Sequence, residues 1–239
     1  MITLEERAAE LYNVIRGCTL CALASTRTHA VPGEGPLNAE VMCIGEAPGM
    51  NEDRQGRPFV GAAGKLLDEL LAAGGLRRDE VYICNVLKCR PPGNRDPLPG
   101  EIEACAEYLD LQIDMVDPLV IVTLGRFSMA RWFPQQAISR IHGSVREFGG
   151  RIVIPMYHPA AALHQQNLRQ VLIEDFRRLP QVVARARSMR FAPGPLAGGI
   201  QPPDALAPPD GPAPTGAVES SALQSAPCGA QPEQIRLFE

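Results

Sequence analysis

Four short apolar runs, each rich in β-branched residues, constrain the fold of this 239-residue chain more than any other feature. A run that is apolar throughout, without alternating polar residues, is typical of a strand buried on both of its faces. Helical periodicity fills the intervals between the runs, and alternation of strand and helix predicts a parallel sheet covered by helices on both faces. The four runs lie at 41–44, 81–87, 119–124 and 152–156.

Apolar residues at helical spacing indicate the helices. An acidic amphipathic helix is expected at the N-terminus, and a long helix is expected at about 167–187, where Leu, Val and Phe recur every three or four residues. One of the helices between them ends at two glycines and another ends before Pro118. These intervening helices are expected at about 63–73, 100–116 and 126–133.

The composition changes sharply near residue 191. Residues 192–233 contain ten prolines and six glycines but few bulky apolar side chains, so this stretch cannot bury enough surface to offset its chain entropy. We therefore predict a globular domain at 1–190, a Pro/Gly-rich disordered linker at 191–233 and a short terminal peptide at 234–239.

The formal net charge of −4 does not exclude a nucleic-acid partner. From residue 191 onward there are five acidic residues and one arginine, so the first 190 residues hold 22 charges of each sign. A neutral domain can still gather arginines on one face. The sequence has no apolar stretch long enough to span a membrane, and its N-terminus is unlike a signal peptide. We therefore expect a cytoplasmic protein, associated with the nucleoid, without membrane partners.

Four of the seven cysteines have the spacing of a metal site. Cys18 and Cys21 form a C-x2-C pair, and Cys89 and Cys105 follow in a loop and a helix. In a reducing compartment such thiols favour metal ligation over disulfides. Spacing alone leaves a structural zinc and an iron–sulfur cluster both open. The other cysteines suit ordinary roles, because Cys43 and Cys84 lie inside apolar strands and Cys228 lies in the predicted linker.

Three irregular segments follow predicted strands, at 45–61, 85–97 and 156–165. Ligands of parallel sheets bind at the carboxyl ends of the strands, so we expect the active site where these segments meet. They contain GEAPGMNEDRQGRPFVG, NVLKCRPPGNRDP and MYHPAAALHQ. Together with the cysteine order, these motifs resemble the family 4 uracil-DNA glycosylases, iron–sulfur enzymes of bacteria and archaea. The resemblance covers roughly residues 1–185.

The resemblance implies a three-layer α/β/α fold with a central four-stranded parallel sheet. It also implies a [4Fe-4S] cluster held by the four cysteines, which favours iron over zinc. The expected activity is that of a monomeric, monofunctional glycosylase of base excision repair. Such an enzyme flips uracil out of single- or double-stranded DNA, hydrolyses its N-glycosidic bond and leaves an abasic site.

Each part of this reaction has a candidate residue. Phe59 is carried over from the family as the ring on which the flipped base stacks, although a ring anchored in the core is the alternative. Asn85 ends the second buried strand, where its amide would read uracil N3 and O4; closing a strand or turn is its alternative role. His158, which precedes a proline, would donate to uracil O2 as negative charge develops.

Glu46 follows the first strand and would position the attacking water or stabilise the sugar cation. At this point the sequence departs from the family 1 pattern G-Q-D-P-Y. The aspartate position is Ala47, which we place in the uracil site, and the tyrosine position is Gly49. Both the group that activates water and the group that excludes thymine are therefore open.

Contacts with DNA are expected on either side of the pocket. A cluster next to the loop after the second strand would fix Lys88, Arg90 and Arg95 for phosphate contacts. Leu163 matches the region from which this superfamily inserts an apolar wedge into the duplex; a contact within a short helix is the alternative.

Two other readings stay open. A non-turnover or covalent uracil-DNA-binding protein of the same superfamily is one. Ser139 to His142 resembles part of the insert that carries the histidine of a covalent relative, but its position argues against that identity. That insert belongs directly after the asparagine strand, so His142 is expected to be an ordinary loop residue. A zinc-containing nucleic-acid adaptor without activity is the other.

The last residues, QIRLFE, resemble the bacterial sliding-clamp pentapeptide Q-L-x-L-F. A glutamine followed by paired apolar anchors suits a small apolar groove, and the linker would leave the enzyme free to search nearby DNA. A chance apolar terminus is the alternative. The anchors of a clamp contact would be Gln234, Ile235, Leu237 and Phe238.

Overall fold

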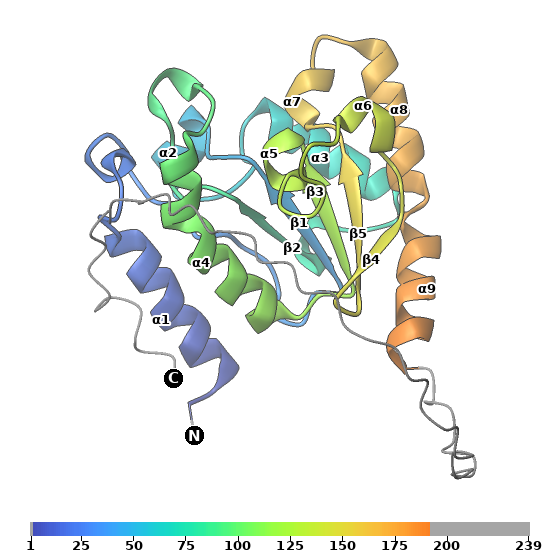
Figure 1. Ribbon diagram of the computed structural model, residues 1–239, viewed down its shortest axis with the longest axis horizontal. Coiled ribbons are helices and arrows are strands. Elements are labelled where there is room, and N and C mark those ends of the chain that lie inside the picture. The colour runs from blue at the N-terminus through green and yellow to red at the C-terminus, as the bar shows by residue number, and fades with distance from the viewer. Residues whose placement is uncertain (1, 192–239) are drawn as a thin grey trace, which may run out of the picture. The chain divides into compact units, whose positions relative to one another are not determined.

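A computed structural model describes residues 2–191 of the chain. The predicted clamp-binding peptide and all but the first residue of the predicted linker lie outside this range, and the division into domain, linker and peptide stays a prediction. Figure 1 shows one sheet covered by helices on both of its faces. This arrangement confirms the predicted three-layer α/β/α fold.

The sheet has the strand order β2-β1-β3-β5-β4. The four predicted strands are present and lie parallel, with Val41 opposite both Val81 and Val120, and Val120 opposite Ile152. Strand β2 ends at Asn85, two residues before its apolar run does. The strands are β1 (Val41–Gly45), β2 (Val81–Asn85), β3 (Val120–Leu124), β4 (Arg146–Phe148) and β5 (Arg151–Met156).

The sheet has five strands, so the prediction of four parallel strands is wrong in number and in direction at one edge. β4 runs antiparallel to β5, with Phe148 opposite Arg151. The turn between them is Gly149-Gly150, and both residues have positive φ, at 55° and 77°. A two-residue Gly-Gly turn is a hairpin signal. Only three residues long and largely exposed, β4 has no apolar run to reveal it.

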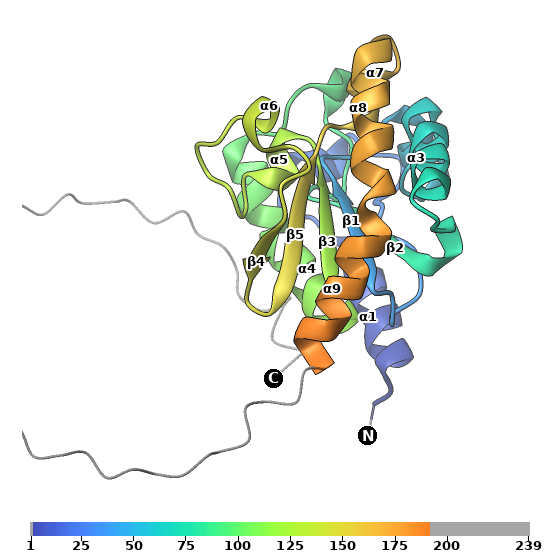
Figure 2. The same cartoon turned by 90° about the vertical axis from the view of Figure 1, so that its right-hand side faces the viewer.

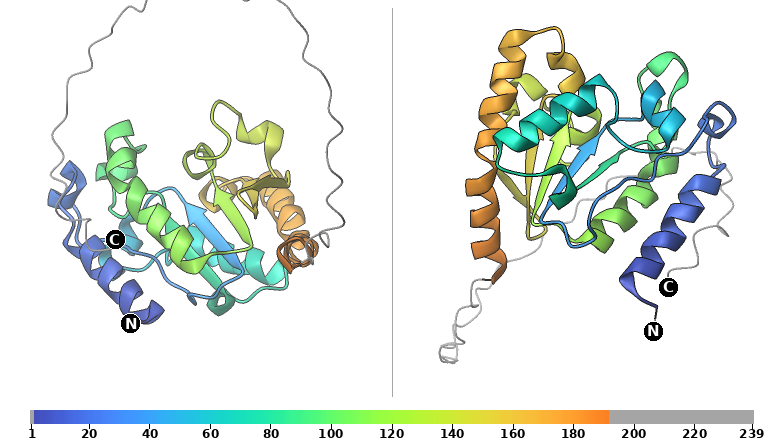
Figure 3. Two further views of the ribbon diagram at one scale, coloured as in Figure 1. Left: turned by 60° about the horizontal axis from the view of Figure 1, so that its bottom comes forward. Right: turned by 180° about the vertical axis from the view of Figure 1, so that it is seen from behind.

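The helices form two layers. Figure 2 shows α3, α8 and α9 on one side of the sheet and α4 with α5 on the other; Figure 3 shows α1 lying beside α4. The α-helices are α1 (Leu4–Gly17), α2 (Met50–Gln55), α3 (Ala62–Ala73), α4 (Pro99–Val116), α5 (Arg126–Met129), α6 (Ile138–Ile141), α7 (Pro159–Ala162), α8 (Gln166–Arg177) and α9 (Leu179–Phe191). The 3-10 helices are η1 (Ala22–Ser25), η2 (Arg78–Glu80) and η3 (Pro92–Asn94).

Two predicted helices differ from the structure. The long helix expected at about 167–187 is divided into α8 and α9, with a break at Arg178. Pro180 is the second residue of α9, and proline fits a first turn but interrupts a continuing helix. The helix expected at about 126–133 ends at Met129, and the chain then turns.

Alternate residues of the strands fill two cores, because successive side chains point to opposite faces. Cys43 and Ile83 pack with α3, α8 and α9, whereas Ile44 and Cys84 pack with α4. Cys43 and Cys84 are fully buried, as their positions in the strands predicted.

Among residues 2–191, no helix is long and apolar enough to cross a membrane.

Candidate active site

A pocket of about 400 Å³ lies at the carboxyl ends of β1, β2 and β5. The strand order reverses between β1 and β3, and open α/β sheets bind ligands at such a point. Six of the predicted site residues line this pocket. They are Glu46, Ala47, Phe59, Asn85, Arg95 and His158.

Gly45 brings two of these groups together. A Cβ atom at this position would lie 2.3 Å from Asn85 Oδ1 and 2.6 Å from Phe59 Cζ. Real Cβ atoms essentially never approach other heavy atoms so closely. The absence of a side chain at the end of β1 therefore allows the amide and the ring to share the floor of the pocket.

The amide oxygen of Asn85 lacks a partner. Asn85 is 2% exposed, and its Oδ1 atom is buried without a hydrogen bond to the described residues. A buried polar atom without a partner costs about 1–3 kcal/mol, and such atoms are rare in folded proteins. An acceptor held unpaired in a pocket fits a ligand that supplies an N–H group.

Phe59 is held in an unusual backbone conformation. Its φ is 51°, in the left-handed region that bulky residues rarely adopt. The ring is 6% exposed and stacks on the His158 imidazole, with ring centroids 5.6 Å apart and planes 25° apart. Phe59 is buried, as the alternative role of a core anchor predicts. The residue also lines the pocket.

His158 is arranged to donate a hydrogen bond as a neutral imidazole. Its Nδ1 accepts from the backbone N–H of Ala160 at 3.1 Å. The proton of the neutral ring therefore resides on Nε2. Burial lowers the pKa of His158 to about 4, although the charge of Glu52 opposes this shift. The ring is neutral at physiological pH and offers one N–H donor.

Glu46 is the half-buried acid at the end of β1. Burial raises the pKa of this carboxyl, the negative charge of Asp96 raises it further and Arg126 opposes the rise. Arg126 and Asp96 form an ion pair with each other. A carboxylate with a raised pKa is a better proton acceptor than an exposed one.

Two polar residues of the pocket wall were not predicted from the sequence. Glu52 lines the pocket and accepts from the backbone N–H groups of Val60 and Gly61 at 2.8 Å each. Asn94 also lines it, and has a positive φ of 54°. Both residues lie within the strand-end motifs, but nothing in those motifs distinguishes them from their neighbours; the turn composition Pro-Pro-Gly-Asn was the only signal for Asn94.

Lys88 is buried, which contradicts its predicted phosphate contact. The residue is 1% exposed, and its Nζ atom donates to the Asn85 backbone oxygen at 2.7 Å and to Gln112 Oε1 at 2.6 Å. A charged residue predicts surface exposure on average, but here it fastens the strand end that carries Asn85 to α4.

The other predicted DNA contacts lie nearer the surface. Arg90 is half-buried and donates to Asn94 Oδ1 at 2.7 Å. Arg95 lines the pocket but forms a two-pronged ion pair with Glu101, at 2.9 and 2.6 Å. Leu163 is 39% exposed directly after α7. It is available as a wedge, whereas His142 is bonded to Asp175 and takes no part in the pocket.

The four predicted cysteine ligands are free thiols, of which Cys18, Cys89 and Cys105 are buried and Cys21 is half-buried. Burial raises the pKa of Cys89, and neighbouring Cys21 and Cys18 raise it further. Burial also raises the pKa of Cys105 to about 11, with Cys89 and Cys21 contributing. Within residues 2–191, no three His, Cys, Asp or Glu side chains already form a site for a metal ion.

The surroundings of these thiols fit a thiolate-bound group. Arg27 Nη1 donates to Cys89 Sγ at 3.0 Å, and the Leu20 backbone N–H donates to Cys18 Sγ at 3.5 Å. The Tyr108 hydroxyl is buried near Cys18 without a hydrogen-bond partner among the described residues. Donors around sulfur stabilise thiolates and tune iron–sulfur centres.

A larger cavity, of about 620 Å³, lies at the opposite edge of the sheet. Its wall includes Glu40 and Arg187, which form an ion pair with each other. None of the residues in the three strand-end segments lines it. The smaller pocket is therefore the candidate active site, because the Asn85 oxygen and five other predicted site residues converge there.

The fold and the pocket define an α/β protein with an aromatic ring and an amide in the wall of one strand-end pocket. Residues 32–178 match the family model described as the uracil DNA glycosylase superfamily. The chain therefore belongs to the uracil-DNA glycosylase superfamily and, as its curated relatives show, to the type-4 enzymes within it.

Three type-4 uracil-DNA glycosylases illustrate the similarity. That of Sulfurisphaera tokodaii is 51% identical over 69% of this chain and 80% of its own length. That of Archaeoglobus fulgidus is 46% identical over 78% of this chain and 98% of its own. That of Thermotoga maritima is 41% identical over 77% and 99%. The resemblance read from the motifs is thus confirmed.

Proposed function

We propose that this chain is a monomeric, monofunctional uracil-DNA glycosylase that flips uracil out of single- or double-stranded DNA, hydrolyses the N-glycosidic bond and leaves an abasic site. One observation carries the proposal: the unpartnered Oδ1 of Asn85 is buried in a pocket beside the ring of Phe59. Uracil has the flat face and the N3–H donor that these two groups require.

In this proposal the flipped base stacks on Phe59, and Asn85 reads its edge. Oδ1 accepts from uracil N3–H, and the amide nitrogen donates to O4. Cytosine has no hydrogen at N3 and carries an amino donor in place of O4, so both contacts would fail. A site built to pair polar groups rejects the wrong ligand strongly, because its own buried groups are left unsatisfied.

Bond cleavage needs a stabilised leaving group. As the bond between the sugar C1′ and uracil N1 breaks, its electron pair moves onto the base and negative charge develops at O2. The N–H at Nε2 of neutral His158 donates to that oxygen. Hydrogen bonds to a charged oxygen are about twice as strong as neutral ones, so the contact strengthens as the bond breaks.

Glu46 serves the other reactant. Its carboxylate lies at the pocket wall, where it orients a water molecule and stabilises the positive charge that develops on the sugar. The water oxygen bonds to C1′, and one water proton passes to the carboxylate. Ala47 leaves no second acid at the adjoining position, which assigns both tasks to Glu46.

Uracil excision tests this proposal directly. The purified protein should release free uracil from uracil-containing oligonucleotides, both single strands and duplexes, while the strand stays intact until heated in alkali. Oligonucleotides with cytosine or thymine at the same position serve as controls. Intact uracil DNA after prolonged incubation would reject the activity, and strand breaks without alkali would reject the monofunctional reaction.

The alternative is a protein that holds uracil DNA without turnover. It predicts a protein–DNA adduct that survives denaturing electrophoresis, at one per protein molecule. We expect many uracils released per enzyme molecule and no adduct, because His142 is bonded to Asp175 away from the pocket.

We further propose that Cys18, Cys21, Cys89 and Cys105 hold a [4Fe-4S] cluster. The group would serve structure, joining the segment after α1 to the loop after β2 and to α4. Protein purified without oxygen should be brown and contain four iron atoms per chain. Zinc in place of iron would reject the cluster, and so would unchanged iron content in a Cys89→Ser variant.

The C-terminal peptide, which lies outside the described residues, is proposed to bind a DNA sliding clamp. Deletion of 234–239 should abolish clamp binding in a surface plasmon resonance assay and leave excision on short oligonucleotides unchanged. An exchange of Leu237 and Phe238 for Ala should have the same effect. Clamp binding that survives both changes would reject the role of the peptide.

A further inference from the structure

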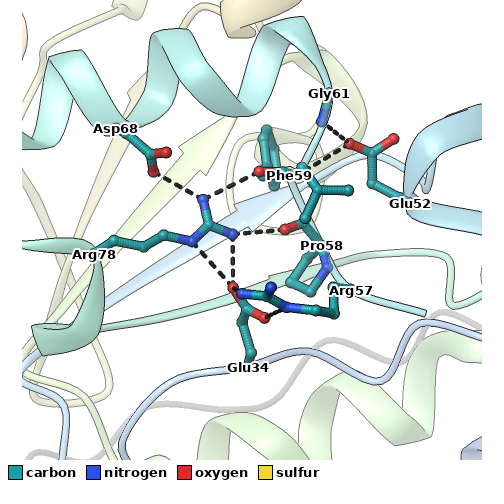
Figure 4. A network of polar contacts seen from close by, with 9 residues as sticks. Glu34, Glu52, Arg57, Pro58, Phe59, Gly61, Asp68 and Arg78 are labelled. Carbon is teal, nitrogen blue, oxygen red and sulfur yellow. Dashed lines mark hydrogen bonds and ion pairs between the residues drawn. The ribbon is translucent and has the colours of Figure 1, made fainter. Parts of the chain in front are cut away.

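We propose that Arg78 is a positioning residue for the proposed reaction, holding the Phe59 ring in the orientation in which a flipped base stacks on it. This inference rests on the proposed function. Arg78 comes from η2, just before β2, and no motif of the pocket includes it. Figure 4 shows its guanidinium group between the loop that carries Phe59 and the carboxylates of Glu34 and Asp68.

Every N–H donor of Arg78 is engaged. Nε and Nη2 donate to Glu34 Oε1 at 3.0 and 2.7 Å, and Nη1 donates to Asp68 Oδ1 at 2.8 Å. The remaining N–H groups of Nη1 and Nη2 donate to the backbone oxygens of Phe59 at 3.1 Å and Pro58 at 2.6 Å. A guanidinium group has five donors, so none is left for a DNA phosphate.

The two carbonyl contacts fix the peptide units on either side of the Phe59 Cα atom. This matters because Phe59 adopts a positive φ of 51°. A strained backbone angle of this kind costs about 1–3 kcal/mol and persists only where the surroundings impose it. Arg78 imposes it from the carbonyl side.

A second set of contacts acts on the next two residues. Glu52 accepts from the backbone N–H groups of Val60 and Gly61. Figure 4 shows the contact between Glu52 and Gly61. Close packing adds to the constraint, because a Cβ atom on Gly64 would lie 1.8 Å from the Phe59 oxygen. Four consecutive residues are therefore held, with the arginine on two carbonyls and the glutamate on two amides.

Arg78 also ties this loop to the strand that carries Asn85. Glu34 pairs with Ile83 of β2 through two backbone hydrogen bonds, at 2.9 and 2.7 Å. Ile83 lies two residues before Asn85 on the same strand. The Arg78–Glu34 pair, only about a quarter exposed on each side, thus connects the stacking ring to the amide that reads the base.

The neighbouring Arg77 provides a matched control. Its side chain is 72% exposed and, among residues 2–191, pairs only with Asp79 and Glu80, within its own turn. Surface pairs of this kind contribute little. Arg77→Gln therefore removes the same charge one residue away without releasing the Phe59 loop.

Single-turnover excision of uracil from an oligonucleotide is the test, with the wild type as the first arm. Wild-type inactivity would refute the proposed function and not the role of Arg78. Given wild-type activity, Arg78→Gln should lower the rate constant at saturating enzyme by ~10- to 100-fold, because small misplacements of a reacting group cost that much. Binding of DNA without uracil should change less than twofold, and Arg77→Gln should match the wild type.

Arg78→Lys separates charge from geometry. A lysine keeps the charge but has three donors in place of a planar fork, so we expect it to restore less than half of the lost rate. Circular dichroism shows whether each variant keeps the fold. The midpoint of its thermal unfolding should lie well above the assay temperature. An Arg78→Lys variant as active as the wild type would overturn the proposal.

A double-mutant cycle with Phe59→Ala decides whether Arg78 acts through the ring. If it does, Arg78→Gln has little further effect once the ring is removed, and the double variant is about as slow as Phe59→Ala alone. Losses that multiply in the double variant would overturn the proposal. If Arg78→Gln fails to fold, Asp68→Asn and Glu34→Gln, which loosen the same guanidinium group, take its place in the cycle.

Discussion

The ring of Phe59 stacks on the imidazole of His158, with ring centroids 5.6 Å apart and planes 25° apart. The two residues are almost a hundred positions apart in the sequence, one in the loop after β1 and the other in the loop after β5. Their contact brings an apolar platform and a hydrogen-bond donor to the same pocket. In the proposed reaction one holds the face of uracil and the other its O2 atom.

Removal of the Phe59 ring should weaken base capture. Stacking of a base on an aromatic side chain contributes about 1–3 kcal/mol, so Phe59→Ala should lower single-turnover excision by ~10- to 100-fold. Phe59→Leu, which keeps an apolar side chain without a flat face, separates stacking from loss of volume. Full activity in the Leu variant would contradict the stacking role.

Substitution of Asn85 should impair recognition more than DNA affinity. Asn85→Ala removes both edge contacts, so we expect excision to fall by more than ~100-fold, because a buried site built to pair polar groups loses at least this much when the contacts are missing. Binding to DNA without uracil, measured by fluorescence anisotropy, should stay within threefold. Equal losses in both assays would contradict recognition by the amide.

A methyl group at position 45 should damage the site and spare the fold. In Gly45→Ala the new Cβ would meet Asn85 Oδ1 and the Phe59 ring below 3 Å, and both must move. Excision should fall by ~100-fold, as expected for a displacement of about 1 Å at a site. Gly100→Ala, with no atom within 4 Å of the added Cβ, is the control and should match the wild type.

The pH dependence should reveal the neutral His158. Burial lowers its pKa from 6.5 to about 4, so the unfolded chain binds a proton at pH 6 that the folded protein does not. The contribution of His158 to the free energy of unfolding is therefore fully present above pH 6.5 and is lost as the pH falls toward 4.

Excision should accordingly show no inflection near pH 6.5, and imidazole NMR signals that disappear in His158→Gln should titrate well below 6. A midpoint at 6–7 for those signals would contradict the neutral donor. The raised pKa of Glu46 also affects the excision rate on the acidic side of the pH profile. The profile is therefore measured in Glu46→Gln as well.

Substitution of Lys88 should affect stability and not DNA electrostatics. In Lys88→Met the Asn85 oxygen and Gln112 Oε1 lose their donor, and the free energy of unfolding should fall by about 2–4 kcal/mol, since each buried unsatisfied group costs about 1–3. The salt dependence of DNA binding should be unchanged.

In Arg90→Gln we expect the slope of log K against log salt to fall by about 1, as for one lost phosphate contact.

The sequence was sufficient for the four parallel strands and for several residues that line the pocket. Apolar β-branched runs identify the four parallel strands because burial on both faces requires apolar residues throughout. Polar residues at or just beyond the strand ends, within motifs that resemble the family, point to Glu46, Asn85 and His158, since parallel strands end at the same side of a sheet. β4 was not predicted, because an exposed edge strand of three residues does not require an apolar run.

Only the tertiary structure decided what each polar side chain faces. By sequence alone Lys88 and Arg90 are equivalent basic residues of one loop, yet one is buried between Asn85 and Gln112 and the other lies near the surface. Arg78 lies outside every motif and Glu52 is one of several charged residues within one, yet the two hold the loop of Phe59 through its carbonyl and N–H groups. Local sequence fixes backbone preference and polarity, whereas a hydrogen-bond partner from a distant segment is set only when the layers pack.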